Sequence, residues 1–362
     1  MFVGHLESNT MKIALLTIWH EKNYGAELQA YATVKVLQNL GHKVEMIDIR
    51  LSDMEEDSLK HKIASFISMF GQGDRSFNRF WKKYIPTTRR YKNIIDLQNE
   101  PPQADVYLVG SDQVWNPDIT KDFAKLYFLN FGDKKTYRIS YASSFGKETW
   151  THPELVAYVR EQFSLFFSVS CREESGIGLL REEFGISAQC VVDPTLLLDD
   201  YTELTGLLTE TPTLVYYPLS YDEDLESYSV QLAKRLGISA INNNSEELLL
   251  GRLPWKRTSI EQWVRNIAQA QFVITRSFHG LVFCLLHQRQ FAILASRNGR
   301  GDRLVNLLKS VGLEDRFYAD TEAIEKDRPW ERKIDYSTIE PLIVQNRKSS
   351  LDFLKMTLES IK

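Results

Sequence analysis

The sequence predicts an α/β protein of two halves, each built around a parallel β-sheet. Its 362 residues exceed the length of most single domains, which have about 100–200 residues. Short β-rich runs alternate with stretches of helical periodicity, which is the pattern of βαβ units and implies parallel strands. The alternation begins again after Asp199 and Asp200, so we expect the two halves to meet near residue 205.

Composition and charge narrow the class of protein. Apolar residues make up 43% of the chain, as in a globular protein, and the net charge of −4 argues against a nucleic-acid partner. The three cysteines have no CxxC spacing, which argues against a disulfide scaffold and a structural zinc site. No apolar run approaches the roughly 20 residues that cross a bilayer, and no export signal opens the chain, so we expect a cytoplasmic protein. Residues 1–10 receive no role.

The first half opens on a complete βαβ unit. Residues 12–18 predict a strand, apolar residues from Leu28 to Leu40 recur at helical spacing, and residues 43–49 predict a second strand. Gly41 stands where a glycine commonly ends a helix. Later in this half we expect strands at 106–109, 137–142, 167–170 and 190–192, and helices at 153–163 and 173–184.

The second half repeats the alternation. We expect strands at 214–217, 272–275 and 291–294, and helices at 224–236, 259–270, 281–287 and 338–361.

The segment after the second strand has a different composition. Residues 63–70 have the apolar spacing of an amphipathic helix, and residues 75–92 carry seven basic side chains, no acidic one and five aromatic ones. The basic residues are Arg75, Arg79, Lys82, Lys83, Arg89, Arg90 and Lys92. We expect a helical insertion at about 55–95, whose basic face is either merely solvated or binds anionic lipid or a diphosphate.

Polar loops follow several predicted strands at their carboxyl ends, where open α/β sheets bind ligands. In the first loop, Asn23, Tyr24 and Gly25 precede a helix whose N–H groups could hold an anion, although a glycine here also has a purely steric explanation. GxGxxG is absent, so no dinucleotide fingerprint is present.

The loop at 110–117 is unusually dense in hydrogen-bonding side chains, with Ser111, Asp112, Gln113 and Trp115 close together. A carboxylate, an amide and an indole suit a sugar, through hydrogen bonds and ring stacking, and a simple turn needs fewer polar residues.

Three further strand ends carry candidates. Ser144 follows one strand, Arg172 stands where another passes into a helix, and Asp193 ends a third. Two of these positions have structural alternatives, since Arg172 is next to Glu173 and an Asp-Pro pair commonly starts a turn.

The sharpest candidate is the loop at 275–280. Here His279 is expected near a helix N-terminus, where an anion would stabilise its protonated form and allow it to act as a general acid. Arg276 and Ser277 strengthen the interpretation as an anion site, and the alternative is a histidine that only caps the helix. Arg303 belongs to an arginine- and glycine-rich loop that is suited to a phosphate, or is only solvated.

Six motifs occur in order along the chain. They are NYGAELQAYA (23–32), VGSDQVWNP (109–117), YASSFG (141–146), SCREE (170–174), VVDPTLLL (191–198) and TRSFHGLVFCL (275–285). Together they resemble the polysaccharide pyruvyl transferase family, from about Met11 to about Phe317.

That resemblance implies two Rossmann-like domains facing across a cleft, similar to GT-B glycosyltransferases. Residues 11–205 would form the acceptor side, residues 206–335 the donor side, and residues 336–362 a C-terminal helix that returns to the first domain. It further implies transfer of pyruvate from phosphoenolpyruvate to two hydroxyls of a sugar in a capsule, exopolysaccharide or wall precursor, giving a cyclic ketal and phosphate. Neither a metal nor another cofactor is expected.

Site roles follow from the same resemblance. His279 is expected to be the general acid, with Asp193 and Asp112 orienting the acceptor hydroxyls or taking their protons. Donor contacts are expected from Arg172, Ser277, Arg276 and Arg303. Acceptor contacts are expected from Asn23, Tyr24, Gly25, Gln29, Ser111, Gln113, Trp115 and Ser144.

Two alternatives stay open. One is a GT-B nucleotide-sugar glycosyltransferase, and the other is a non-catalytic sugar-binding protein of a polysaccharide assembly complex. The resemblance also leaves open whether the acceptor is linked to a lipid diphosphate, and whether the protein contacts the inner membrane face.

Overall fold

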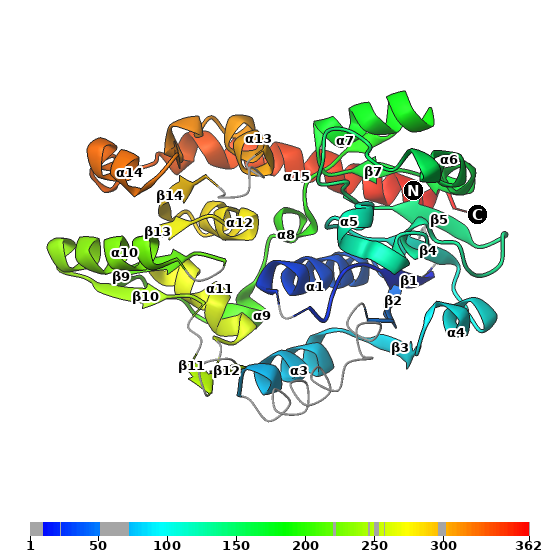
Figure 1. The fold of residues 1–362 in the computed structure, drawn as a ribbon, viewed down its shortest axis with the longest axis horizontal. Helices are drawn as coiled ribbons and strands as arrows, with labels where there is room; N and C mark the ends of the chain where they lie inside the picture. Colours follow the sequence, from blue (N-terminus) through cyan, green and yellow to red (C-terminus); the bar gives the residue numbers. More distant parts are fainter. Residues whose placement is uncertain are drawn as a thin grey trace, which may run out of the picture. The chain divides into compact units, whose positions relative to one another are not determined.

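The computed structural model describes residues 10–21, 23–50, 72–219, 222–244, 247–249, 253–256, 258–295 and 302–361. These residues form two compact units (Figure 1). Unit 1 contains the described residues between 10 and 50, 81 and 198, and 348 and 361; unit 2 contains those between 72 and 80 and between 199 and 347. Each unit has its own parallel sheet, which confirms the predicted α/β class with two Rossmann-like sheets.

The main sheet of unit 1 has the order β3-β2-β1-β4-β5-β6 in the described part of the chain, and its strands are parallel. The strands are β1 (Lys12–Leu16), β2 (Lys43–Asp48), β3 (Thr87–Arg90), β4 (Val106–Val109), β5 (Tyr137–Ser140) and β6 (Phe166–Ser168). The strand order reverses between β1 and β4. Ligands of open parallel sheets bind beyond the carboxyl ends of the strands at such a reversal.

Helices connect these strands. They are α1 (Tyr24–Asn39), α4 (Ile94–Asn99), α5 (Pro117–Thr120), α6 (Val156–Phe163), α7 (Glu174–Leu179) and α8 (Pro194–Leu197), with short turns at Lys121–Phe123, Leu126–Phe128 and Pro153–Leu155 and a π-helical turn at Leu180–Phe184. Two short strands, β7 (Ser170–Cys171) and β8 (Gln189–Cys190), pair in parallel next to the main sheet. Helices α3 (Gln72–Tyr84) and α15 (Tyr336–Glu359) contain residues of both units.

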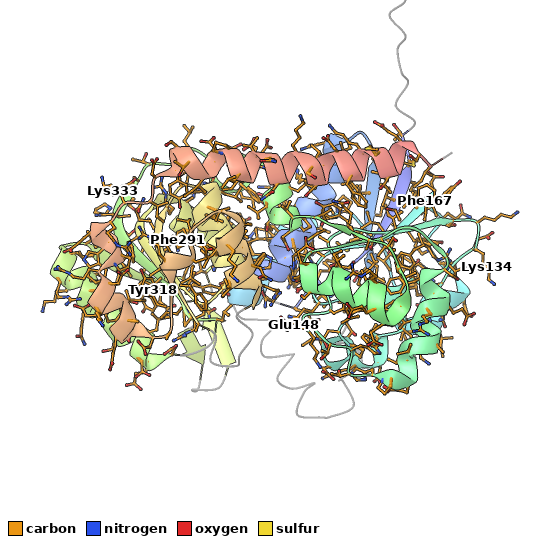
Figure 2. The ribbon with its side chains drawn as sticks, turned by 90° about the horizontal axis from the view of Figure 1, so that it is seen from above. Lys134, Glu148, Phe167, Phe291, Tyr318 and Lys333 are labelled. Atoms are coloured by element: carbon orange, nitrogen blue, oxygen red, sulfur yellow. The ribbon has the colours of Figure 1, made fainter. Side chains whose placement is uncertain are left out.

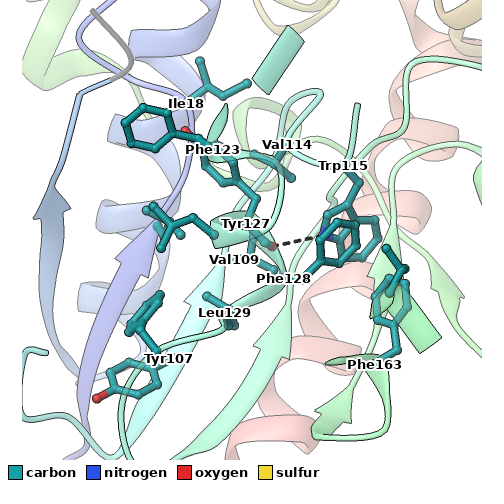
Figure 3. Packing of buried hydrophobic residues seen from close by; sticks show 14 of the residues in the cluster. Ile18, Tyr107, Val109, Val114, Trp115, Phe123, Tyr127, Phe128, Leu129 and Phe163 are labelled. Atoms are coloured by element: carbon teal, nitrogen blue, oxygen red, sulfur yellow. Dashed lines mark hydrogen bonds between the residues drawn. The ribbon is translucent and has the colours of Figure 1, made fainter. Parts of the chain in front are cut away.

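Aromatic side chains dominate the core of unit 1 (Figure 3). The ring of Trp115 is parallel to that of Phe128 at 6.1 Å and meets that of Phe163 edge-on at 5.1 Å. Its indole N–H donates to the backbone carbonyl of Tyr127 over 3.2 Å, so the one polar atom of this side chain is satisfied inside the core.

The sheet of unit 2 has the order β10-β9-β13-β14-β15 among the described strands, again parallel. The strands are β9 (Thr211–Tyr217), β10 (Ser239–Asn242), β13 (Ala270–Thr275), β14 (Gln290–Leu294) and β15 (Phe317–Tyr318), and β11 (Glu247–Leu249) and β12 (Leu253–Lys256) form a separate antiparallel pair. The strand order reverses between β9 and β13, which is the position at which open parallel sheets bind ligands.

The helices of unit 2 surround a second core. They are α9 (Thr202–Thr205), α10 (Glu223–Leu236), α11 (Ile260–Gln269), α12 (Phe278–Leu286), α13 (Asp302–Ser310) and α14 (Thr321–Asp327), with short turns at Glu314–Arg316 and Pro329–Glu331. Phe291 and Tyr318 are buried in this unit, whereas Lys333 is exposed (Figure 2).

The structure corrects several predicted bounds. Helix α12 begins at Phe278 rather than Leu281, because Ser277 caps it, so His279 lies in the first helical turn and not in a loop. The predicted strand at 167–170 is divided between β6 and β7.

The helical insertion predicted at about 55–95 is also corrected. Residues 87–90 are strand β3, paired with β2 at the edge of the main sheet. Pro86 follows α3, and a proline disfavours helical backbone in the residue before it. The predicted helix at 63–70 lies outside the described residues.

Candidate functional site

Left-handed backbone marks the carboxyl edge of the unit 1 sheet. His20, Asp112 and Ala142 have φ of 66°, 75° and 55°, and each follows one of the neighbouring strands β1, β4 and β5. Such residues carry strain unless the surrounding structure fixes them, and they concentrate at functional sites. In unit 2, Leu219 (φ 69°) follows β9 in the same way. These four positions lie at the edges that the strand orders indicate, whereas Lys121, Leu129, Gln288 and Arg328, which also have positive φ, lie elsewhere among the described residues.

Hydrogen bonds continue the unit 1 sheet beyond its strands. Asp112 forms a parallel bridge with Ser143, and Ser143 forms one with Cys171. The Ser144 amide donates to the Asp112 carbonyl over 3.0 Å, and the Arg172 amide donates to the Ser143 carbonyl over 3.2 Å. Three of the predicted site loops are thus joined into one surface by their backbones.

A buried ion network lies at this edge. Arg172 Nη1 donates to Asp193 Oδ2 over 2.7 Å, and Arg172 Nε donates to Glu173 Oε1 over 3.1 Å. Ser111 donates to the same Asp193 oxygen over 3.0 Å, and Ser144 donates to Glu173 over 2.8 Å. Both carboxylates, together with the nearby Asp112, keep the pKa of the guanidinium above its ordinary value even though burial opposes the charge.

The partners of Arg172 limit what it can do. Two carboxylates hold its guanidinium, and its side chain is 3% exposed. The pairing with Glu173, one of the two alternatives from the sequence, is present in the structure. A contact between Arg172 and the donor stays a prediction.

In unit 2, the first turn of α12 lies directly after β13. Ser277 caps the helix by accepting a hydrogen bond from the Gly280 amide over 3.1 Å, and its own hydroxyl hydrogen can still be donated. A side chain at Gly280 would meet Thr275 Oγ1 at 2.8 Å, so glycine lets α12 approach the strand. His279 is 8% exposed in this turn, at the positive end of the helix dipole.

The arginines predicted for the donor site differ in their surroundings. Arg276 donates from Nε to Asp222 over 3.1 Å and also to the backbone carbonyl of Ala295, so it links the carboxyl ends of β13 and β14. Arg303 lies over the ring of Phe278 at 5.9 Å, next to His279 in the chain. The other arginines of that loop lie outside the described residues.

With the geometry of both edges described, comparison with known proteins becomes informative. The family description "Polysaccharide pyruvyl transferase" matches residues 23–298, which is more than half of the chain. The chain belongs to the polysaccharide pyruvyl transferase family. The match spans β13, the start of α12 and the site loops named above from Asn23 on. It ends before Arg303, which the structure places in helix α13 and not in the predicted loop.

Solved structures to which the chain is similar include two glycosyltransferases and a UDP-bound protein. An alpha-glucosyltransferase in complex with UDP and DNA has 11% identity and a TM-score of 0.46, with 95% of each chain covered. The spinosyn rhamnosyltransferase SpnG has 10% identity and a TM-score of 0.46, covering 97% of this chain and 100% of its own. The S. aureus MnaA–UDP structure has 11% identity and a TM-score of 0.48, covering 92% and 91%. No curated protein matches the sequence.

Several residues predicted to contact the acceptor are buried in the structure. Trp115, Gln29, Ser111 and Ser144 are 0% exposed, because each is packed or hydrogen-bonded within unit 1. Trp115 belongs to the aromatic core, with no exposed ring face for a sugar, and the acceptor roles of all four residues stay predictions. Gln29 donates to Thr17 Oγ1 and to the Ile18 carbonyl, and thereby holds the end of β1.

The first loop is only partly buried. Asn23 is exposed and caps α1 by accepting from the Gly25 and Ala26 amides at 2.9 and 3.4 Å, so these two amides are already bonded in the structure. Tyr24 is 2% exposed, which argues against a direct sugar contact. Gln113 and Asp112 are partly exposed, so they are the better-placed candidates of their loop.

Sequence reasoning missed Glu27. This carboxyl group is 0% exposed, and burial raises its pKa to about 8. It accepts from the Trp81 indole at 2.5 Å and from the Glu21 amide at 3.1 Å. An acidic residue in the NYGAELQ motif was the available signal, since a glutamate among apolar helix positions is rarely buried without a partner.

The basic segment divides into an inner and an outer face. Phe77, Phe80, Trp81 and Tyr84 of α3 are buried, whereas Arg75, Arg79, Lys82 and Lys83 are exposed. The exposed face of the described part of α3 is therefore cationic and has no exposed aromatic ring. Arg89 is paired with Asp96 and Glu100, so it adds less positive charge to this surface than the α3 residues do.

Two features are absent from the described residues. No helix among them is long and apolar enough to span a bilayer. In the same part of the chain, no three His, Cys, Asp or Glu side chains form a group suited to a metal ion.

Proposed function

We propose that the protein transfers pyruvate from phosphoenolpyruvate to two hydroxyls of one sugar in a surface-polysaccharide precursor, forming a cyclic ketal and releasing phosphate. The family membership supports a transferase acting on a polysaccharide. The observation that carries the specific proposal is the first turn of α12, which combines a histidine and a serine cap at the binding edge of the unit 2 sheet.

The donor chemistry suits that turn. Phosphoenolpyruvate carries a phosphate and a carboxylate, and a helix N-terminus favours negative charge through its dipole and its amides. The Ser277 hydroxyl can donate to a phosphate oxygen, and Arg303, beside Phe278, supplies a cation nearby in the same unit. Arg276 is paired with Asp222 and so supports the turn before α12. We therefore propose that it helps donor binding indirectly, by holding this turn in place.

His279 is proposed as the general acid. It gives its proton to the methylene carbon of phosphoenolpyruvate, which leaves an oxocarbenium-like carbon. One sugar hydroxyl attacks this carbon and loses its proton; the second hydroxyl then attacks as the phosphate leaves, closing the ketal. Two C–O bonds and one C–H bond form, while two O–H bonds, the C=C π bond and the C–O bond to phosphate break. The two hydroxyl protons balance the proton given by His279 and the proton taken up by the released phosphate, so no oxidant is needed.

The acceptor is proposed to bind at the unit 1 edge, between the loops that follow β1 and β4. Asp112 is the stronger of the two predicted aspartates for this role, because it is partly exposed and has left-handed backbone. Asp193 is 1% exposed and is held by Arg172, Ser111 and Thr195, so it acts by fixing the loop.

The cationic face of α3 suggests the form of the acceptor. Arg75, Arg79 and Lys82 are exposed on a chain of net charge −4. We propose that these residues bind the diphosphate of a lipid-linked acceptor or the anionic surface of the cytoplasmic membrane leaflet, which attracts such clusters.

Thermal unfolding with ligands tests the donor. A ligand at about 100 times its dissociation constant adds about 2.7 kcal/mol to stability. Phosphoenolpyruvate should raise the melting temperature of the wild-type protein and of His279→Asn by a similar amount. With an acceptor sugar present, wild type should release phosphate and His279→Asn should not. A shift with UDP or a UDP-sugar, and none with phosphoenolpyruvate, would instead support a glycosyltransferase. No shift with either ligand would support a non-catalytic sugar-binding protein.

A further inference from the structure

His20 occupies a conspicuous position at the end of β1. Its φ of 66° is left-handed, and it is the first of the three left-handed residues along the binding edge of unit 1. Strand β1 borders the reversal of strand order, so the loop that contains His20 lies where the sheet topology places a ligand.

The imidazole of His20 has a rigid support. It is stacked on the indole of Trp81, with 3.4 Å between ring centroids and 26° between the ring planes. Trp81 is 5% exposed and Trp19 is 3% exposed, and these two indoles meet edge-on at 6.3 Å. His20 itself is partly exposed. One face of the imidazole is therefore covered by the indole while the side chain still reaches the surface.

Glu27 fixes this support from the first turns of α1. Its carboxyl group accepts the Trp81 indole N–H over 2.5 Å and the Glu21 amide over 3.1 Å, so it ties the α3 aromatic and the His20 loop to the same helix. The backbone of His20 also bonds to this carboxyl group. Through these three contacts, Glu27 fixes both the Trp81 indole beneath His20 and the left-handed backbone of His20.

The next loop along the sheet lies close to the same place. Thr17, directly after β1, donates from its hydroxyl to the backbone carbonyl of Ser111 over 2.7 Å. The strands before these loops are paired in register, Leu16 with Val109. The loops after β1 and β4 are therefore neighbours, although they come from distant parts of the sequence. Asp112 and the His20 loop flank the same stretch of the sheet edge.

We propose that His20 is a catalytic residue on the acceptor side: its imidazole binds a hydroxyl of the sugar and takes the proton of that hydroxyl as the oxygen attacks the donor carbon. Trp81 and Glu27 are the positioning residues that hold the ring. In this step one O–H bond breaks, one C–O bond forms and the proton passes to the imidazole. This inference rests on the proposed pyruvyl transfer and extends it to the acceptor.

The variants are chosen to separate the imidazole from the backbone that carries it. His20→Asn and His20→Gly remove the ring but suit left-handed backbone, since asparagine and glycine adopt positive φ more readily than other residues. Trp81→Phe keeps an aromatic ring below His20, whereas Trp81→Ala removes it. Lys134→Ala, at an exposed position, is the control for the effect of substitution itself.

The assay follows phosphate release from phosphoenolpyruvate with a panel of p-nitrophenyl hexosides that have free 4- and 6-hydroxyls. Loss of a general base lowers turnover by about 100- to 10,000-fold. We expect this loss in kcat for His20→Asn and His20→Gly. The KM for phosphoenolpyruvate and the thermal shift that it causes should not change. Added imidazole should partly restore the turnover of His20→Gly. Trp81→Ala should lower kcat, and Trp81→Phe should retain most of it.

The two proposals fail differently. If the wild-type protein releases phosphate and His20→Asn and His20→Gly do so equally fast, the role of His20 is overturned and pyruvyl transfer stands. If the wild-type protein is neither shifted by phosphoenolpyruvate nor active with any hexoside, pyruvyl transfer itself fails, and the role of His20 fails with it.

Discussion

Arg172 and Asp193 form a buried ion pair at the carboxyl edge of the unit 1 sheet, with 2.7 Å between Nη1 and Oδ2 and side-chain exposures of 3% and 0%. The pair joins the SCREE and VVDPTLLL motifs, which are 21 residues apart between these two positions. Asp193 also caps α8 through the Thr195 amide, and α8 packs against α1. The pair therefore connects two strand ends to the helix that follows β1.

Breaking this pair should destabilise unit 1. Removing one partner leaves a buried charge, which costs about 3–5 kcal/mol, so Arg172→Met and Asp193→Asn should each unfold at lower urea concentration. The double variant Arg172→Met/Asp193→Asn should lose less than the sum of the two, because each single substitution already breaks the same Arg172–Asp193 pair; Glu173, the other partner of Arg172, keeps its bond from Ser144. Urea unfolding followed by circular dichroism measures this, and additive losses would contradict it.

Glu27 should make stability fall with rising pH. Its pKa is raised from 4.5 to about 8 in the folded protein, so between these values the folded state holds a proton that the unfolded state has released. The free energy of unfolding therefore decreases as pH rises through this window, by at most about 1.4 kcal/mol per unit of pKa shift. Above about pH 8 it levels off.

Glu27→Gln is the matched control, because glutamine has nearly the same shape, keeps one of the two acceptor oxygens and does not titrate. The free energy of unfolding of both proteins is measured from about pH 5 to about pH 9. As pH rises, wild type should lose stability relative to Glu27→Gln. A pH-independent difference would mean that Glu27 is ionised in the folded protein.

Trp115 should affect stability and not acceptor binding. Removing a large buried aromatic side chain costs about 3–5 kcal/mol, so Trp115→Ala should be strongly destabilised. Trp115→Phe keeps most of the packing, loses the bond to the Tyr127 carbonyl, and should retain the KM for the acceptor. A raised acceptor KM in a normally stable Trp115→Phe protein would restore the sugar-stacking interpretation.

The two histidines of the α12 region should respond oppositely to substitution. His279→Asn should reduce kcat by about 100- to 10,000-fold with little loss of stability, as expected for a general acid. His287, at the other end of the helix, is stacked on Phe283, and burial lowers its pKa to about 4. His287→Ala should therefore lower the melting temperature while the folded protein keeps its turnover. Equal turnover of wild type and His279→Asn would remove His279 from the mechanism.

Charge reversal on α3 should weaken binding to anionic membranes. Arg79→Glu/Lys82→Glu is expected to reduce sedimentation with vesicles that contain phosphatidylglycerol, and added salt should have the same effect on wild type because exposed charges are screened. The matched control Lys134→Glu/Lys135→Glu changes the same amount of charge at another exposed position. Equal losses in both double variants would point to net charge and not to the α3 face.

Much of the fold follows from local sequence. The strand at 106–109 was predicted with the bounds that β4 has, because a short apolar run between polar residues leaves little choice. The start of α12 was placed three residues too late, since the sequence shows the apolar run from Leu281 more clearly than the capping role of Ser277. The strand β3 was missed because its Thr-Thr-Arg-Arg sequence is polar and is stabilised by pairing with β2 at a sheet edge.

The sequence by itself determined the class of sheet, the family motifs and the residues that follow each strand, because these depend on periodicity and on short-range order. Tertiary structure alone decided which of those residues face solvent. Trp115 stands in a polar loop motif and Gln29 in a helix motif, yet both are buried. Trp115 packs against Phe128 and Phe163, and Gln29 donates to Thr17 and Ile18 at the end of β1. Glu27 became visible as a candidate only when α3 brought Trp81 against it, since a buried carboxyl group acquires its raised pKa from the protein around it.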